Sequence, residues 1–275
     1  YAQGKFDLTI ALLATVTTLL LQILSNFAND LGDFSNGVDN ADRKVALRAV
    51  QTGKISQEEM KAAVILTAAF AFLSGLVLLY LGLKDAPLEV WGTFLGLGVA
   101  SIAAAIAYTV GKRPYGYMGL GDLSVFLFFG LIGTAGTYYL QTFSLNLALF
   151  LPASGCGFLS VAVLNLNNLR DIENDIKTGK NSIPVRIGKT FGFYYQKFLY
   201  LAAITCFYAY PFAAGIKVNG VQQLLIVGIY PIIQLFRELH SGMSAAQIDP
   251  YLKKTALRTL FLILVFGAIQ ILTSQ

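Results

Sequence analysis

Charged residues are scarce in this 275-residue sequence. Asp, Glu, Lys and Arg together make up 13% of the chain, about half of the ~25% that soluble domains carry. Hydrophobic residues make up 56%, and the mean hydropathy is +0.63. This composition excludes an ordinary soluble domain and favours a protein that spans a membrane.

Cysteine and histidine are also rare. The two cysteines, Cys156 and Cys206, both lie within apolar runs, and no CxxC motif occurs. The single histidine is His240. A disulfide framework and a Cys/His zinc site are therefore excluded. No basic stripe interleaved with aromatic residues is present, so we expect no nucleic-acid partner.

Apolar segments of about 20 residues recur along the chain, and each is long enough to cross a hydrocarbon core of ~30 Å. They lack the period-two alternation of barrel strands, so we expect helices. The sequence predicts an all-α membrane protein with eight spans in this chain: Leu8–Ala28, Ala62–Leu83, Leu88–Val110, Leu123–Leu140, Leu145–Asn165, Tyr195–Gly215, Val221–Leu239 and Ala256–Thr273.

Basic residues are distributed unevenly between the two sides of the predicted bundle. All twenty Lys and Arg except Lys5, Lys84 and Lys217 fall at or within the odd-numbered loops, counted from the first loop after the first span; Arg43 and Lys44 are among them. The positive-inside rule places these loops in the cytoplasm. We expect a multi-pass protein of the bacterial inner membrane whose long cytoplasmic loops form the working site.

Two clusters of Asn and Asp interrupt this apolar chain. Asn26, Asn29, Asp30 and Asp33 follow one another at helical spacing at the end of the first span. A second cluster ends the fifth span and consists of Asn165, Asn168, Asp171 and Asp175.

Carboxylates one helical turn apart repel, and each costs roughly 2.5–3.5 kcal/mol at the bilayer centre. A compensating cation is therefore expected. Oxygen ligands without nearby His or Cys favour Mg²⁺, which typically completes its shell with substrate phosphate. The alternative is that the acids merely solvate a helix end.

The clusters are separated by four spans, so both have the same orientation in the membrane. We interpret the chain as one domain, 1–275, with parallel pseudo-repeat halves of about 1–140 and 141–275. Facing clusters of this kind would fit a diphosphate held between two Mg²⁺ ions.

Four segments carry a resemblance to a known family: LQILSNFANDLGD, LRAVQTGKIS, AYTVGKRPYGYMGLGD and NLNNLRDIENDIKTGKNSIPVRIG. Over Leu20 to Gly188 the sequence resembles the UbiA superfamily of intramembrane aromatic prenyltransferases. Within it, the sequence is most similar to the branch that prenylates 1,4-dihydroxy-2-naphthoate in menaquinone biosynthesis. The resemblance implies Mg²⁺-dependent transfer of a polyprenyl group from polyprenyl diphosphate, with loss of CO₂ and diphosphate, giving demethylmenaquinone.

The resemblance also implies a nine-helix bundle with a cavity open to lipid, whose first helix we expect upstream of Tyr1. One departure concerns the pattern NDxxDxxxD, which would place a third Asp at position 37. This sequence has Gly37 there and Asp39 two residues later, so we assign Asp39 only as a weaker ligand.

Candidate site residues follow from the clusters and the resemblance together. The metal ligands are Asp30, Asp33, Asp171 and Asp175, with Asn26 as a further ligand. Tyr108 and Lys112 match the family's YxxxK element and join the four aspartates as catalytic candidates. The substrate-binding candidates are Asn26, Asn29, Asn168, Arg170, Lys180, Arg186, Tyr115, Tyr117 and Asp122. Asp122 has the alternative interpretation of a helix N-cap.

Other functions remain open at this point. The acceptor is alternatively 4-hydroxybenzoate or homogentisate, and the donor alternatively a phytyl diphosphate. An ion-coupled transporter is a more distant alternative, although transporters usually place their acids at the midplane of inverted repeats.

Overall fold

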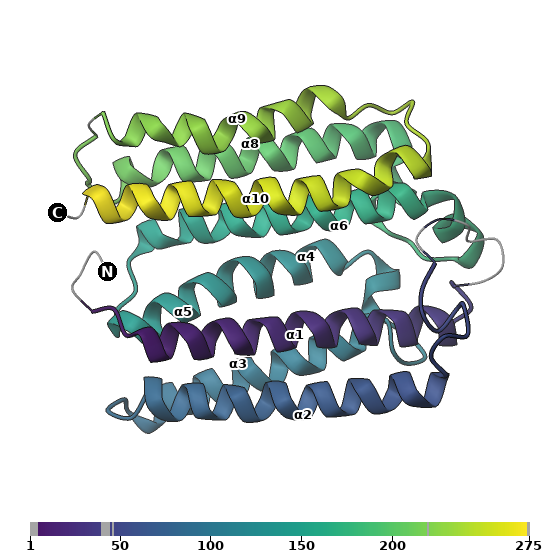
Figure 1. Cartoon of the computed structure of the whole chain (residues 1–275), viewed down its shortest axis with the longest axis horizontal. Coiled ribbons are helices and arrows are strands. Elements are labelled where there is room, and N and C mark those ends of the chain that lie inside the picture. The colour runs from purple at the N-terminus through teal and green to yellow at the C-terminus, as the bar shows by residue number, and fades with distance from the viewer. Residues whose placement is uncertain (1–4, 40–44, 46, 219, 274–275) are drawn as a thin grey trace.

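The computed structural model describes residues 5–39, 45, 47–218 and 220–273; the regular elements among them are all helices, without strands. Arg43 and Lys44, included in the topology prediction, lie outside the described residues. The helices run roughly parallel or antiparallel to one another, as Figure 1 shows. In chain order the long helices are α1 (Leu8–Ser35), α2 (Gln57–Gly82), α3 (Leu88–Ala107), α6 (Phe150–Thr178), α8 (Lys189–Ala213), α9 (Leu225–Glu238) and α10 (Ala245–Thr273).

Between α3 and α6 in the order of the chain, three consecutive helical segments form one further rod. It consists of α4 (Gly121–Val125), the π-helical segment η2 (Phe126–Ile132) and α5 (Gly133–Thr142). The short helices are η1 (Tyr115–Met118), η3 (Leu147–Leu149), α7 (Ile183–Ile187) and η4 (Gln222–Leu224). Each of the eight predicted spans therefore overlaps a helical rod.

Local sequence explains where several helices begin and end. The Asp7 carboxylate caps α1, accepting from Thr9 N at 2.7 Å and Ile10 N at 3.1 Å. Ser56 and Glu59 form a capping box at the start of α2. At the carboxyl end of α6, Gly179 adopts a φ of 74°, a left-handed conformation that glycine takes without a steric penalty.

Six of the rods are long and apolar enough to cross a membrane: α1, α2, α3, α4 to α5, η3 to α6, and α10. The other two rods, α8 and η4 to α9, were also predicted as spans, but they are not among these six; α8 packs on α6, and α9 on α10. The helix α8 is less apolar, since it carries five tyrosines, and α9 is shorter, with only 14 residues. The prediction of an all-α, multi-pass membrane fold is confirmed.

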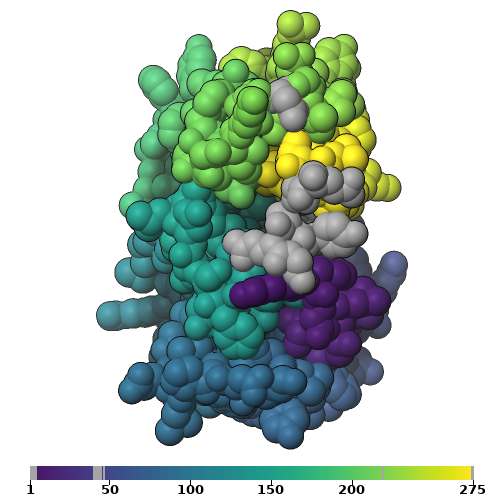
Figure 2. All heavy atoms as spheres, turned by 90° about the vertical axis from the view of Figure 1, so that its left-hand side faces the viewer, coloured from purple at the N-terminus to yellow at the C-terminus, as the bar shows by residue number. Residues whose placement is uncertain are grey.

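The helices gather in two groups that follow the chain (Figure 1). In the first group, α1 packs on α2 and α3; in the second, α6 packs on α8 and α10. The rod of α4, η2 and α5 contacts both groups, mainly through η2 against α6. Figure 2 views one end of the bundle, where earlier residues lie at the bottom and later ones at the top. The division of the chain into pseudo-repeat halves of about 1–140 and 141–275 stays a prediction.

Close approach of backbones joins the middle rod to α6 and the end of α1 to the segment after α3. A Cβ at Gly130 in η2 would lie 2.6 Å from Gly157 Cα in α6, so only glycine permits this contact. Gly32 in α1 is similar: a Cβ there would lie 2.5 Å from the backbone of Thr109. The Thr109 hydroxyl also donates to Ala28 O at 2.9 Å. These contacts fix the end of α1 against the segment that follows α3.

Candidate active site

The two Asn/Asp clusters lie at the same end of the bundle, at the carboxyl ends of α1 and α6 (Figure 1). Both helices continue past the predicted spans, α1 to Ser35 and α6 to Thr178. The helical spacing predicted within each cluster is therefore real. Asp33 and Asp175 are buried, at 0% and 1% exposed.

Arg48, in the loop between α1 and α2, lies among the first cluster's acids. Its Nη1 is 3.1 Å from Asp30 Oδ1, its Nη2 is 3.1 Å from Asp33 Oδ2, and its Nε is 3.4 Å from Asp39 Oδ2. The Asn29 side-chain oxygen, in the amide orientation that satisfies both of its ends, accepts from Nη2 at 2.8 Å. One guanidinium thus gathers four side chains.

The charges around Arg48 dominate its electrostatics. Burial lowers the pKa of the guanidinium, but Asp33, Asp39 and Asp30 together outweigh burial, so its pKa is raised above the ordinary value. Arg48 stays protonated, and its charge compensates carboxylates that would otherwise repel one another.

Gly37 stands at the position where the family's acidic pattern has an Asp. It follows the end of α1 with a φ of 73°, a conformation that Asp would adopt only with strain. The turn is closed by Val38 N donating to Asp33 O at 2.8 Å. It brings Asp39, which is 5% exposed, back to Arg48. The weaker candidate Asp39 therefore does lie with Asp30 and Asp33.

The second cluster meets the first through Lys180. Its Nζ lies 3.7 Å from Asp33 Oδ2, and its backbone N donates to Asp175 O at 2.9 Å. The Asn174 side chain donates to Val38 O at 2.9 Å. The predicted approach of the two clusters is therefore present in the structure.

Within the second cluster, Asp171 pairs with Arg170, whose Nε lies 2.8 Å from Asp171 Oδ1. Arg170 also binds Asp249 at the start of α10 at 2.8 Å and Asn167 Oδ1 at 2.7 Å. Asp175 accepts from Ser182 Oγ at 3.2 Å.

Tyr117, in the helix η1, lies near two other predicted residues, Lys180 and Arg186. The Tyr117 hydroxyl donates to Asp33 Oδ1 at 2.6 Å, and Lys180 Nζ lies 5.4 Å from the centroid of its ring. Burial and the Asp33 carboxylate raise the pKa of Tyr117 above its ordinary value. Arg186 donates to Met118 O and to Asn181 O. Tyr117, Lys180 and Arg186 thus line or support the acidic centre.

The remaining three asparagines of the two clusters differ in their surroundings. Asn26 is exposed and accepts a 3.4 Å hydrogen bond from Gln22. Asn165 is buried and donates to Gln196 of α8 at 2.7 Å; its role is packing. Asn168 is buried, at 3% exposed.

The YxxxK element is not a helical pair, because α3 ends at Ala107. Tyr108 packs edge-on against Tyr115 at 5.5 Å, whereas Lys112 is exposed. The Tyr115 hydroxyl donates to Ala104 O at 2.8 Å and ties η1 to α3.

Asp122 is not an N-cap, so that alternative is wrong: the N-cap of α4 is Leu120, and it makes no side-chain cap. Instead, Asp122 Oδ2 accepts from the Tyr195 hydroxyl of α8 at 2.9 Å. Sequence reasoning missed both Arg48 as a site residue and Tyr195. A signal for Arg48 exists in hindsight, since LRAVQTGKIS is one of the four family-like segments.

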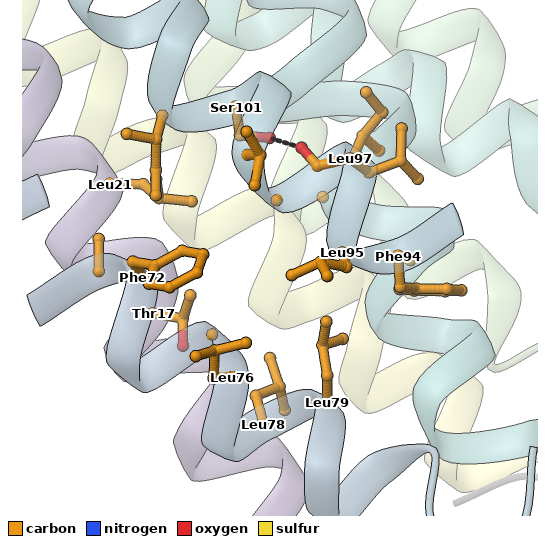
Figure 3. Close-up of a pocket in the computed structure, with 18 of the residues that line it drawn as sticks. Thr17, Leu21, Phe72, Leu76, Leu78, Leu79, Phe94, Leu95, Leu97 and Ser101 are labelled. Atoms are coloured by element: carbon orange, nitrogen blue, oxygen red, sulfur yellow. Dashed lines mark hydrogen bonds between the residues drawn. The ribbon is translucent and has the colours of Figure 1, made fainter. Parts of the chain in front are cut away.

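An apolar cavity of about 140 Å³ lies elsewhere, among α1, α2, α3 and α5. Figure 3 shows hydrocarbon side chains such as Leu21 and Phe72 around it, while the Ser101 hydroxyl is bound to Leu97 O. None of the Asn and Asp residues of the two clusters lines this cavity. We therefore place the chemistry at the acidic centre and not in this cavity.

The acidic centre fits a divalent cation by its chemistry. Its side chains carry carboxylate and amide oxygens, and Asp175 Oδ1 is buried without a hydrogen-bond partner among the described residues. In the described part of the chain no three His, Cys, Asp or Glu side chains converge closely enough to hold an ion. Arg48 and Lys180 provide the positive charge there.

Fold and site together define a multi-pass helical membrane protein with a paired acidic centre at one end. Residues 1–254 match the UbiA prenyltransferase family, and the chain belongs to it. The chain is 42% identical over 262 residues to 1,4-dihydroxy-2-naphthoate octaprenyltransferase of Haemophilus influenzae, covering 95% of this chain and 84% of that one. It is 43% identical over 264 residues to the Escherichia coli enzyme of the same name, covering 96% and 84%.

A solved structure of digeranylgeranylglyceryl phosphate synthase has the same fold. Its TM-score is 0.54 at 18% sequence identity, and the match covers 96% of this chain and 88% of that one. Membership of the UbiA family makes this chain a prenyltransferase of the membrane, as the sequence predicted.

Proposed function

We propose that this protein transfers a polyprenyl group from polyprenyl diphosphate to 1,4-dihydroxy-2-naphthoate, giving demethylmenaquinone with loss of CO₂ and diphosphate. The observation that carries the proposal is the 42–43% identity to naphthoate octaprenyltransferases over almost the whole chain. The acidic centre supports it, because a diphosphate needs the mixture of cations and oxygen ligands that meets there. The length of the prenyl chain does not enter the proposal.

Mg²⁺ is the proposed metal, held by Asp30, Asp33, Asp171 and Asp175. When bound it would neutralise charge that develops on the departing diphosphate. Asn29 and Asn168 would orient these carboxylates. Asn26 would be a further ligand, and Asp39, which shares Arg48 with Asp30 and Asp33, a weaker one. Hard oxygen ligands support Mg²⁺ over softer metals.

The cationic side chains at the centre would orient the diphosphate. Lys180 lies within 3.7 Å of Asp33, so its ammonium group can contact a phosphate held against the first cluster. Arg170 and Arg186 are further candidates from the second half. Lys112 is exposed and would reach the substrate only from the surface of the loop.

The aromatic acceptor is assigned to the side of the centre that holds Tyr108, Tyr115 and Asp122. The Asp122–Tyr195 pair offers one carboxylate and one hydroxyl to a ring hydroxyl. The polyprenyl tail would lie among the apolar helices, which exclude water from the allylic cation. The positive-inside distribution supports a cell-membrane protein with this centre facing the cytoplasm.

Asp30→Asn and Asp171→Asn test the acidic centre. Each removes a charge while keeping the side-chain shape, so we expect near-complete loss of prenyl transfer with the fold retained. Asp85→Asn, in an exposed turn between α2 and α3, is the matched control and should transfer normally. Substantial Mg²⁺-dependent turnover by either cluster variant would contradict the assigned role.

An acceptor screen tests the substrate. Purified protein with geranylgeranyl diphosphate is offered dihydroxynaphthoate, 4-hydroxybenzoate or homogentisate in separate reactions. We expect product from dihydroxynaphthoate. Selective use of 4-hydroxybenzoate would overturn the acceptor while leaving the prenyltransferase activity in place.

A further inference from the structure

Arg48 is held at the acidic centre by a loop that is anchored in the helix core. Val50, two residues further on, is buried at 4% exposed and packs with α1 and α2. Thr52 N donates to Arg48 O at 3.0 Å, and Arg48 N donates to Gln51 Oε1 at 3.3 Å. The backbone of Arg48 is therefore fixed, and only its long side chain is free to change partners.

The Arg48 guanidinium occupies the oxygen set that a divalent cation would require. All three of its nitrogens lie within 3.4 Å of a carboxylate oxygen, on Asp30, Asp33 and Asp39. Its side chain is only 11% exposed. An ion that takes Asp30 Oδ1 and Asp33 Oδ2 must displace Arg48 from them.

Release of Arg48 is unfavourable unless the guanidinium finds another anion, because an uncompensated charge in a buried site is strongly destabilising. A diphosphate is such an anion, since the planar guanidinium binds phosphate oxygens through two parallel hydrogen bonds. The exchange of partners would free the carboxylates for the metal and hold the diphosphate at the same time.

We propose that Arg48 is a positioning residue that holds the first carboxylate cluster in the substrate-free protein and competes there with the divalent cation, so that cation and diphosphate bind tightly only together. This inference rests on the proposed function for the identity of the diphosphate. A single side chain, Arg48, would thus couple the binding of the cation to the binding of the diphosphate.

Arg170 has a different role, although it pairs with the second cluster in a similar way. It also binds Asp249 of α10 at 2.8 Å and Asn167 at 2.7 Å. Because these partners lie outside the acidic centre, Arg170 keeps hydrogen bonds whether or not Asp171 is taken by a metal. The coupling is therefore assigned to Arg48.

The test measures Mn²⁺ binding to the purified full-length chain without prenyl donor or acceptor, by the electron paramagnetic resonance signal of free Mn²⁺. A competing conformation favoured about tenfold weakens apparent affinity about tenfold. Arg48→Gln should therefore bind Mn²⁺ about tenfold more tightly than the wild type. Arg258→Gln, which removes a cation paired with Glu238 at 3.6 Å, is the matched control and should bind as the wild type does.

A second measurement adds inorganic diphosphate at one fixed concentration. Complex formation in solution is then the same for every variant, so differences report the protein. The wild type should gain more Mn²⁺ affinity on addition of diphosphate than Arg48→Gln does. Arg48→Lys keeps the charge but lacks the planar fork, so without diphosphate it should show a smaller tightening in the same direction.

Equal or weaker Mn²⁺ binding by Arg48→Gln would overturn the proposal. If that variant does not fold, an unchanged affinity in Arg48→Lys decides against it instead. The outcome is separable from the proposed function: failure of every acceptor with the Mn²⁺ difference intact would refute prenyl transfer alone. Normal transfer with no Mn²⁺ difference would refute the role of Arg48 alone.

Discussion

Gly32→Ala is the substitution whose effect the structure defines most sharply. Gly32 lies between Asp30 and Asp33 on α1, at the point where α1 touches the segment after α3. A Cβ at this position would lie 2.5 Å from the carbonyl carbon, carbonyl oxygen and hydroxyl of Thr109. Two of these atoms belong to the backbone, so no rotamer change relieves the contact and α1 must move away.

The movement would break two hydrogen bonds that cross this contact. Thr109 Oγ1 donates to Ala28 O at 2.9 Å, and Asn36 Nδ2 donates to Thr109 O at 2.9 Å. Overpacking costs about 1–3 kcal/mol, each lost hydrogen bond about 1 kcal/mol, and alanine regains about 1 kcal/mol of helix propensity. The expected net loss in unfolding free energy is therefore about 2–4 kcal/mol.

The assay compares thermal unfolding in detergent, followed by circular dichroism, with prenyl transfer by the same preparation. Gly96→Ala in α3 is the matched control, since a Cβ there meets nothing within 4 Å. It should be neutral or more stable by up to about 1 kcal/mol. Gly32→Ala should melt earlier and lose activity, because Asp30 and Asp33 shift with α1. A Gly32→Ala protein as stable and active as Gly96→Ala would refute the close contact.

Two further substitutions separate the site from its support. Tyr117→Phe removes the 2.6 Å hydrogen bond to Asp33. A bond to a charged group is worth about 1.5–3 kcal/mol, so the unfolding free energy should fall by no more than this amount. Because Asp33 loses a partner that orients it, kcat/KM for prenyl transfer should fall tenfold or more, and an unaltered kcat/KM would contradict this role. Asn165→Ala leaves Gln196 of α8 without its 2.7 Å partner and should lower the unfolding free energy by about 1–3 kcal/mol. An unchanged melting temperature, or a changed KM for the prenyl diphosphate at normal stability, would count against a packing role for Asn165.

The sequence located the membrane helices well because hydropathy over 20 residues reports contact with lipid directly. It placed their polar ends less well. The first span was predicted to end at Ala28, but α1 continues to Ser35, and α6 likewise runs to Thr178. Backbone hydrogen bonding continues beyond the lipid-facing part, and hydropathy does not report it.

The acidic centre was predictable as far as helix periodicity reaches. Spacing along one helix placed Asp30 with Asp33 and Asp171 with Asp175. Arg48 was not found, because residue spacing in a long polar loop does not distinguish the basic residue that turns inward from those that face solvent. Only its place in the family-like segment LRAVQTGKIS sets it apart.

Lys112 was predicted as a catalytic residue from the family's YxxxK element, but it is exposed. A motif shared with a family does not determine how exposed its residues are. The helix ends at Ala107, and the turn that follows leaves Lys112 at the surface. Contacts between distant segments, such as that between Tyr195 and Asp122, depend on tertiary packing and leave no local trace.

The four-residue helix η1 constrains how this protein can change over evolution. Through Tyr117 it binds α1 at Asp33, and its backbone accepts from Asn181 N at 3.0 Å. The helix η1 thus joins its own loop, between α3 and α4, to the loop that contains Asn181, more than 60 residues further along the chain. An insertion or deletion in either loop would displace the hydroxyl from the carboxylate. The lengths of these two loops should therefore be inherited together, while the turns at the opposite end of the bundle are free to vary.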